Sequence, residues 1–176
     1  MDFRRPLLLV DLLLRLGIAG LFIYAGVVKI WDFSAGTSAT PQFFQDLLNY
    51  QLGAWDFKVV GLRLTAWDTF LILAHYLPWL EVAAGLALLS RRLRWGAALI
   101  LIGLTAAFMA ALSSAWVRDL DISCGCFGRG EAQSTDFPVL IARDGALLLA
   151  LWFVAGMEWR RLRHAGQAER AAVPAV

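Results

Sequence analysis

TFLILAHYLPWLEVAAGLALL, residues 69–89, is the stretch of sequence that decides the fold. Glu81 is its only Asp, Glu, Lys or Arg, and a helix needs about 20 mostly apolar residues to cross the hydrocarbon core of a bilayer. Three further runs have the same character and cover residues 12–30, 95–115 and 138–159. A chain inside a bilayer satisfies its backbone hydrogen bonds internally, which helices do segment by segment. The sequence therefore predicts an all-α integral membrane protein built as a four-helix bundle.

The composition supports a membrane protein and excludes several soluble classes. Hydrophobic residues make up 60% of the 176 residues and charged residues 17%, whereas soluble domains carry about 45–50% apolar and about 25% charged residues. The net charge is only +2, and the basic side chains gather beside the apolar runs, so no nucleic-acid partner is expected. The chain has no glycine-rich phosphate loop, HExxH zinc motif or Ser-His-Asp pattern, and no metal site is predicted.

Arginines in the short connections predict the orientation of the helices, because cytoplasmic loops of membrane proteins are enriched in Lys and Arg. They precede the first run, fill the turn between the second and third, and follow the fourth: Arg4, Arg5, Arg91, Arg92, Arg94, Arg160, Arg161, Arg163 and Arg170. We therefore predict a multi-pass protein of the bacterial inner (plasma) membrane with both termini cytoplasmic. Residues 31–68 and 116–137 then face outward.

The first apolar run is predicted to be a retained helix rather than a cleaved signal peptide. It stays hydrophobic to Ile30, carries Asp11 and Arg15, and has no convincing small-x-small cleavage site. Residues 1–160 are predicted to form a single membrane domain. Residues 161–176 are predicted to be a cytoplasmic tail, whose last ten residues, QAERAAVPAV, are expected to be disordered.

Two local patterns add detail to the bundle. In the outer segment, TPQFFQDLLNYQL (residues 40–52) has apolar side chains at helical spacing, with Thr40 as the expected N-cap and Pro41 at the first helical position. It predicts a short amphipathic helix that lies on the membrane surface or caps the bundle. The third run has a face of small residues, which predicts close packing of neighbouring helices there: Gly96, Gly103, Ala107, Ala110 and Ser114.

DISCGCFGRG, residues 121–130, holds the only two cysteines of the chain, Cys124 and Cys126, in the predicted outward-facing segment. Disulfides persist outside the cytoplasm. A Cys-Gly-Cys disulfide closes a very small ring, so it stabilises little as a staple, and it requires a constrained backbone, for which Gly125 supplies the freedom. A strained, exposed disulfide is easily reduced, so the pair is predicted to exchange with another protein. Half of a shared metal site and an inert loop staple are the alternatives.

Ionisable side chains inside the apolar runs form a second candidate site. A charge near the bilayer centre costs at least ~2.5–3.5 kcal/mol, so such groups usually face the bundle interior and pair. Glu81, Arg143 and Asp144 are predicted to point inward, with Arg143 as the partner of a carboxylate. Lys29 ends the first run. These four groups either lock the helices in register or form a proton or quinone site, and a quinone is the only cofactor that this pattern suggests.

Four stretches of the chain resemble the MauE branch of the DoxX-like membrane proteins. They are GLFIYAGVVKIWD (residues 20–32), LPWLEVAAGLALL (77–89), DISCGCFG (121–128) and ARDGALLLAL (142–151). The resemblance covers roughly residues 12–155. It implies a four-helix protein of the bacterial inner membrane that assists maturation of the disulfide-rich small subunit of methylamine dehydrogenase, with a thioredoxin-like partner. It further implies a redox pair and a polar core, made of Cys124 and Cys126, and of Lys29, Glu81, Arg143 and Asp144.

The leading hypothesis is a membrane thiol–disulfide redox protein, a component of a thiol–disulfide oxidoreductase system. In it, Cys124 and Cys126 assist the oxidative maturation of an exported, disulfide-containing client. The first rival is a quinone-linked oxidoreductase subunit that uses Glu81, Arg143 and Asp144. The second rival is a non-enzymatic membrane scaffold for a periplasmic thioredoxin-like partner. A transporter is not favoured, because four helices with one small polar cluster leave little room for a pathway unless the protein forms an oligomer.

Overall fold

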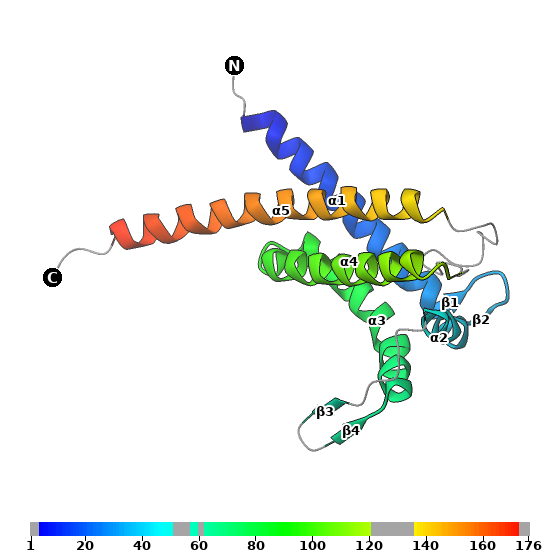
Figure 1. Cartoon of the computed structure of the whole chain (residues 1–176). Helices are drawn as coiled ribbons and strands as arrows, with labels where there is room; N and C mark the ends of the chain where they lie inside the picture. Colours follow the sequence, from blue (N-terminus) through cyan, green and yellow to red (C-terminus); the bar gives the residue numbers. More distant parts are fainter. Residues whose placement is uncertain (1–3, 51–56, 60–61, 121–135, 173–176) are drawn as a thin grey trace.

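The computed structural model describes residues 4–50, 57–59, 62–120 and 136–172. Four long helices account for most of them: α1 (Arg4–Ile30), α3 (Ala66–Leu89), α4 (Arg94–Val117) and α5 (Phe137–Ala172). Each contains a segment long and apolar enough to cross a membrane: Leu9–Ile30, Trp67–Leu89, Arg94–Val117 and Phe137–His164. The protein is therefore an all-α multi-pass membrane protein, which confirms the predicted fold class (Figure 1).

Two of these helices are longer than the apolar runs that predicted them. α1 begins at Arg4 rather than near residue 12, and α5 continues to Ala172 rather than ending near residue 159. α5 thus includes residues 167–172, so the prediction that these residues are disordered is wrong. Hydropathy marks only the apolar part of a helix, whereas Arg, Ala, Leu and Glu favour helix outside the membrane as well.

The four long helices pack as two pairs around one core. α1 packs mainly against α3, and α4 mainly against α5, with further contacts between α3 and α4 and between α1 and α5. Figure 1 shows α4 and α5 side by side, with α1 crossing them at an angle. All four helices contribute side chains to the central core: Ile18, Ala19, Phe22, Ala84, Leu88, Ala97, Ala98, Leu101, Leu151, Val154 and Ala155.

The backbones of α1 and α3 approach each other closely at two glycines. A Cβ atom added at Gly26 would meet the Pro78 carbonyl oxygen at 2.6 Å, and one added at Gly85 would meet the Ala19 carbonyl oxygen at 3.1 Å. The prediction that the small residues of the third apolar run make such a contact is wrong. On that face of α4, Gly96, Gly103, Ala107 and Ala110 are exposed and Ser114 is half-buried, because this helix turns other residues toward α5.

The segment between α1 and α3 holds two small hairpins and one short helix. β1 (Trp31–Asp32) pairs antiparallel with β2 (Thr37–Ser38), and β3 (Phe57–Val59) pairs antiparallel with β4 (Leu62–Leu64). α2 (Thr40–Asn49) lies between the hairpins in the chain. The hairpins were not predicted, because strands of two or three residues are too short to show an alternating pattern.

α2 caps one end of the bundle, which is one of its two predicted placements. Its buried face packs on the first half of α3 in a cluster formed by Phe43, Phe44, Phe70 and Ala74. The N-cap is Ala39, with no side-chain cap hydrogen bond, so Thr40 is the first helical residue rather than the cap. Pro41 lies in the first turn, as predicted, where its missing N–H costs no helical hydrogen bond.

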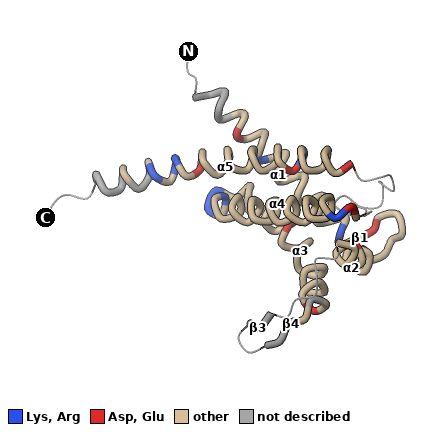
Figure 2. The backbone as a smooth tube through the Cα atoms, viewed as in Figure 1, with Lys and Arg blue, Asp and Glu red and all other residues tan. Residues whose placement is uncertain are grey.

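Charged residues concentrate at the two ends of the bundle, and the membrane spans between them are mostly uncharged (Figure 2). The start of α1, the turn at residues 90–93 and the end of α5 lie at one end, which we call the arginine end. The β1–β2 hairpin, α2, the end of α4 and the start of α5 lie at the other, which we call the α2 end, while the β3–β4 hairpin lies apart from them beside the start of α3 (Figure 1). This arrangement is what four antiparallel spans require.

Candidate functional site

Cys124 and Cys126 belong to residues 121–135, which lie outside the described residues. The structure does describe the two places to which that segment is attached. Leu120, after α4, packs in the same hydrophobic cluster as Phe137 at the start of α5. Both attachment points therefore lie next to each other at the α2 end.

A hydrogen bond holds the end of α4 against α2. Arg118 Nη2 donates to the backbone oxygen of Tyr50, the residue that follows α2, at 2.6 Å. Tyr50 is itself buried in the cluster that contains Leu120. The end of α4 is thus fixed to the capping helix as well as to α5.

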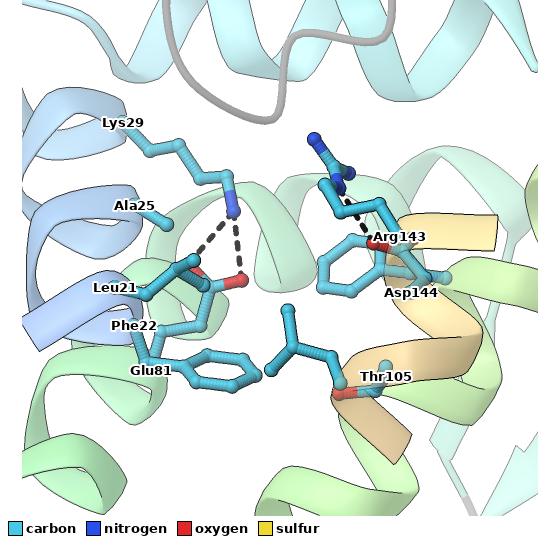
Figure 3. Close-up of a pocket in the computed structure, with 10 residues that line it drawn as sticks. Leu21, Phe22, Ala25, Lys29, Glu81, Thr105, Arg143 and Asp144 are labelled. Carbon is cyan, nitrogen blue, oxygen red and sulfur yellow. Dashed lines mark hydrogen bonds and ion pairs between the residues drawn. The ribbon is translucent and has the colours of Figure 1, made fainter. Parts of the chain in front are cut away.

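A buried ion pair joins α1 to α3. Lys29 Nζ lies 2.7 Å from both Oε1 and Oε2 of Glu81, and the two residues are only 4% and 1% exposed. Lys29 follows Gly26 by about one helical turn, and side chains on a helix lean toward its N-terminal end. Lys29 therefore reaches back to Glu81, which follows Pro78 on the facing helix (Figure 3).

Two aromatic rings surround the Lys29 ammonium group. The ring centroid of Phe108 on α4 is 5.1 Å from Nζ, and that of Phe43 on α2 is 5.4 Å away. Aromatic faces attract a cation at this range, most strongly where water is excluded. Lys29 thus contacts α2, α3 and α4 at once, and the capping helix covers the ion pair.

A second ion pair comes from α5. Arg143 Nε lies 2.9 Å from Asp144 Oδ1. Asp144 is buried, whereas 29% of the Arg143 side chain is exposed. The inward orientation predicted for Glu81, Arg143 and Asp144 is what the structure has, since all three line one cavity (Figure 3). The cation at Glu81, however, is Lys29, and Arg143 pairs with its own neighbour.

The two ion pairs lie on opposite sides of a small cavity (Figure 3). Its volume is about 40 Å³, which is room for about two or three water molecules, whereas sites for cofactor-sized molecules commonly measure ~300–1,000 Å³. The cavity is therefore too small for a quinone ring as the side chains lie. The lining residues come from α1, α3, α4 and α5: Leu21, Phe22, Ala25, Lys29, Glu81, Thr105, Phe108, Arg143, Asp144 and Leu147.

A second group of buried charges lies at the arginine end, and sequence reasoning missed it as a site. We call it the charge network; its members are Asp11, Arg15, Arg94, Glu158 and Arg161. Glu158 Oε2 lies 3.2 Å from Arg94 Nη1, 3.7 Å from Arg15 Nη2 and 3.6 Å from Arg161 Nη1. Asp11 pairs with Arg15 one turn further along α1 and with Arg161 Nη2 at 3.4 Å. The network ties α1, α4 and α5 together.

A sequence signal for this network exists. Asp11 and Arg15 are four residues apart inside an apolar run, the spacing at which helical side chains pair. Arg94, Glu158 and Arg161 lie at the ends of apolar runs, where hydropathy gives no reason to expect a buried partner.

An apolar layer separates the cavity from the charge network. Leu88, Leu101, Leu151 and Val154 are fully buried there, at 0% exposure, as part of the central core. Between the two charged levels, none of the four long helices carries a Lys, Arg, Asp or Glu. The described residues therefore form two polar levels with a dry layer between them.

A family model described as methylamine utilisation protein MauE matches residues 7–156. The matched range includes both cysteines and all four members of the cavity ion pairs, and it ends before Glu158 and Arg161. No curated protein and no solved structure matches the chain.

Proposed function

The chain belongs to the MauE family of methylamine utilisation proteins, and from this premise we propose that it is a thiol–disulfide redox protein of the bacterial inner membrane. Cys124 and Cys126 form the redox pair and assist the oxidative maturation of an exported, disulfide-containing client. The observation that carries the proposal is the family match over residues 7–156, because it includes the only two cysteines of the chain, in one segment between two membrane spans.

The proposed reaction is two successive thiol–disulfide exchanges. A thiolate of the client attacks one sulfur of the Cys124–Cys126 disulfide, and the other sulfur leaves as a thiolate. A second client thiolate then attacks the mixed disulfide, so the client gains a disulfide while Cys124 and Cys126 gain two electrons and two protons. The disulfide of a thioredoxin-like partner reoxidises the pair by the same steps and becomes a dithiol.

The geometry at the α2 end supports this role. Leu120 and Phe137 pack in one cluster, so the cysteine-bearing segment starts and ends on fixed neighbours. Cys124 follows Leu120 by four residues, and four residues of fully extended chain span at most about 14 Å. This anchoring keeps the cysteines close to the α2 end, where a soluble partner on that side of the membrane can reach them.

We propose that the α2 end faces the periplasm and that both termini are cytoplasmic. The arginines of the turn at residues 90–93 and of the end of α5 gather at the opposite end (Figure 2), where the positive-inside rule places the cytoplasm. We further propose that residues 1–160 form one membrane domain and that residues 161–176 extend into the cytoplasm, mostly as the end of α5.

The cavity ion pairs are proposed to keep the base of the cysteine segment rigid. Lys29 and Glu81 hold α1 to α3 beneath α2, and Asp144 orients Arg143 on α5.

Trapping of mixed disulfides tests the proposal. In Cys124→Ser or Cys126→Ser, the remaining thiolate can still attack the disulfide of the thioredoxin-like partner. The second cysteine that would resolve the resulting mixed disulfide within the protein is missing, so the mixed disulfide with the partner accumulates. We expect at least one of the two variants to give a larger, reductant-sensitive species on a non-reducing gel when cells are treated with acid before lysis. Mass spectrometry of the adduct then identifies the other protein.

The double variant, Cys124→Ser with Cys126→Ser, is the control and should give no adduct. Full client maturation in that double variant, with the protein present at the normal level in the membrane, would reject the redox role. It would favour the scaffold hypothesis, in which the outer segment only anchors a thioredoxin-like protein.

A quinone-linked role for Glu81, Arg143 and Asp144 stays a prediction. It requires the cavity to open well beyond its volume of about 40 Å³. It also requires quinone reduction to continue in the double cysteine variant, which the thiol–disulfide proposal excludes.

A further inference from the structure

The charge network at the arginine end carries more positive than negative charge. Three guanidinium groups, from Arg15, Arg94 and Arg161, surround two carboxylates, from Asp11 and Glu158. Four of the five residues are less than a tenth exposed, and Arg161 is the member that reaches the surface, with 37% of its side chain exposed. Every guanidinium group contacts a carboxylate, but the described side chains of the network have a net charge of +1, and Arg161 is the member that solvent and lipid can reach.

The network also has a buried donor without a partner. Arg15 Nε makes no hydrogen bond, although the residue is only 5% exposed, and Asp11 Oδ1 likewise has no donor. Buried polar groups in proteins are usually satisfied by protein, water or a ligand. Asp11 Oδ1 needs a hydrogen-bond donor such as water, whereas the net positive charge of the network favours an anion.

The charge network lies at the ends of the membrane spans, and this position indicates which kind of anion it meets. Asp11 and Arg94 lie at the very start of their apolar spans, and Arg161 lies near the end of the span of α5. Beside them, the rings of Trp95 and Trp159 stack at 5.6 Å. Trp is enriched at the level of the lipid headgroups in membrane proteins, so these residues fit a position at the membrane surface.

We propose that the Arg161 edge of the charge network binds the phosphate of an anionic phospholipid in the leaflet on that side. A phosphodiester carries one negative charge, which matches the single excess positive charge. Arg presents a planar fork of donors that suits phosphate oxygens. Asp11 and Glu158 contribute by fixing the three guanidinium groups in place. Arg163, whose guanidinium lies 5.0 Å from the Trp159 ring centre, flanks the site.

Retention of lipid by the purified full-length protein tests this proposal. Native mass spectrometry in detergent is run with added phosphatidylglycerol, phosphatidylcholine or inorganic phosphate. We expect the wild-type protein to retain phosphatidylglycerol preferentially. Arg161→Gln should weaken that retention about tenfold, as expected for the loss of one charge-assisted contact.

Arg92→Gln is the matched control, because Arg92 is an exposed arginine of the same end that takes no part in the network. Equal losses in Arg161→Gln and Arg92→Gln would overturn the proposal in favour of diffuse attraction. Equal retention of phosphatidylcholine would overturn it too. Competition by inorganic phosphate at similar concentration would assign the site to a soluble anion instead. If Arg161→Gln does not fold, Arg161→Lys keeps the charge without the fork, and unchanged lipid retention in that variant contradicts the proposal.

Discussion

The Lys29–Glu81 pair is a buried interaction in which each charge depends on the other. Lys29→Met leaves Glu81 without its cation in a site that is almost fully excluded from solvent. Loss of one partner of a buried pair costs about 3–5 kcal/mol, whereas an apolar replacement of both partners is often neutral. We expect a large fall in the thermal unfolding midpoint for Lys29→Met, and recovery of most of it in Lys29→Met with Glu81→Leu.

The control for this pair is Leu13→Ala on the same helix, where the side chain is 67% exposed. It should leave the midpoint nearly unchanged. A double variant as unstable as the single one would mean that Lys29 and Glu81 contribute separately and that their pairing is not what stabilises the helices.

At this scale, the sequence identified the members of the cavity site but not their partners. Glu81, Arg143 and Asp144 were predicted to face inward because a charge is costly in an apolar run. The partner of Glu81 depends on where α1 and α3 cross, and that is set by Gly26 and Pro78, two residues whose contact has no signature in a single sequence. The charge network is the opposite case, because a charged residue inside an apolar run, such as Asp11 or Arg15, already indicates a buried partner.

At the scale of elements, the contact between α1 and α3 depends on the lack of a side chain at Gly26. An alanine there would place its Cβ 2.6 Å from the Pro78 carbonyl oxygen, which belongs to the backbone and cannot rotate away. Overpacking of this kind commonly costs about 1–3 kcal/mol. Gly26→Ala is therefore expected to lower the thermal unfolding midpoint.

Gly20→Ala supplies the comparison within α1, because a Cβ at Gly20 meets nothing within 4 Å. Alanine favours a helix over glycine by about 0.5–1 kcal/mol, so this variant should be neutral or slightly more stable. Equal thermal unfolding midpoints for Gly26→Ala and Gly20→Ala would mean that α1 and α3 do not cross at Gly26.

The long helices could be predicted because each needs only an apolar run of sufficient length. Their ends could not, since hydropathy says nothing about residues such as Arg4 to Leu8 or those after Trp159. α2 was found from its spacing of Phe and Leu, and its cap was misplaced by one residue because Thr40 forms part of the first turn. The two hairpins depend on contacts across turns rather than on a repeating pattern.

At the scale of the whole molecule, the proposed orientation makes a direct prediction. Ser34 lies exposed beside β1 at the α2 end, and Arg92 lies exposed in the turn at the arginine end. In a background with Cys124→Ser and Cys126→Ser, we expect Ser34→Cys to react with a membrane-impermeant maleimide in intact cells. Arg92→Cys should react only after the membrane is permeabilised.

The reverse labelling pattern would place the cysteine-bearing segment in the cytoplasm, where glutathione and thioredoxin keep thiols reduced. Labelling of both positions from outside would contradict four antiparallel spans. The reversed pattern would contradict the proposed oxidative role, whereas labelling of both positions would contradict the number of spans only.

The dry layer, which is formed by Leu88, Leu101, Leu151 and Val154, resists the passage of ions through the bundle. A transmembrane voltage drops across such a layer, at about 2.3 kcal/mol per elementary charge for each 100 mV, and no ionisable Lys, Arg, Asp or Glu bridges it. In the proposed orientation, no charged side chain among the described residues offers protons a path through this layer to the cytoplasmic side. We therefore expect the thiol–disulfide chemistry proposed at the α2 end to exchange its protons with the periplasmic solution.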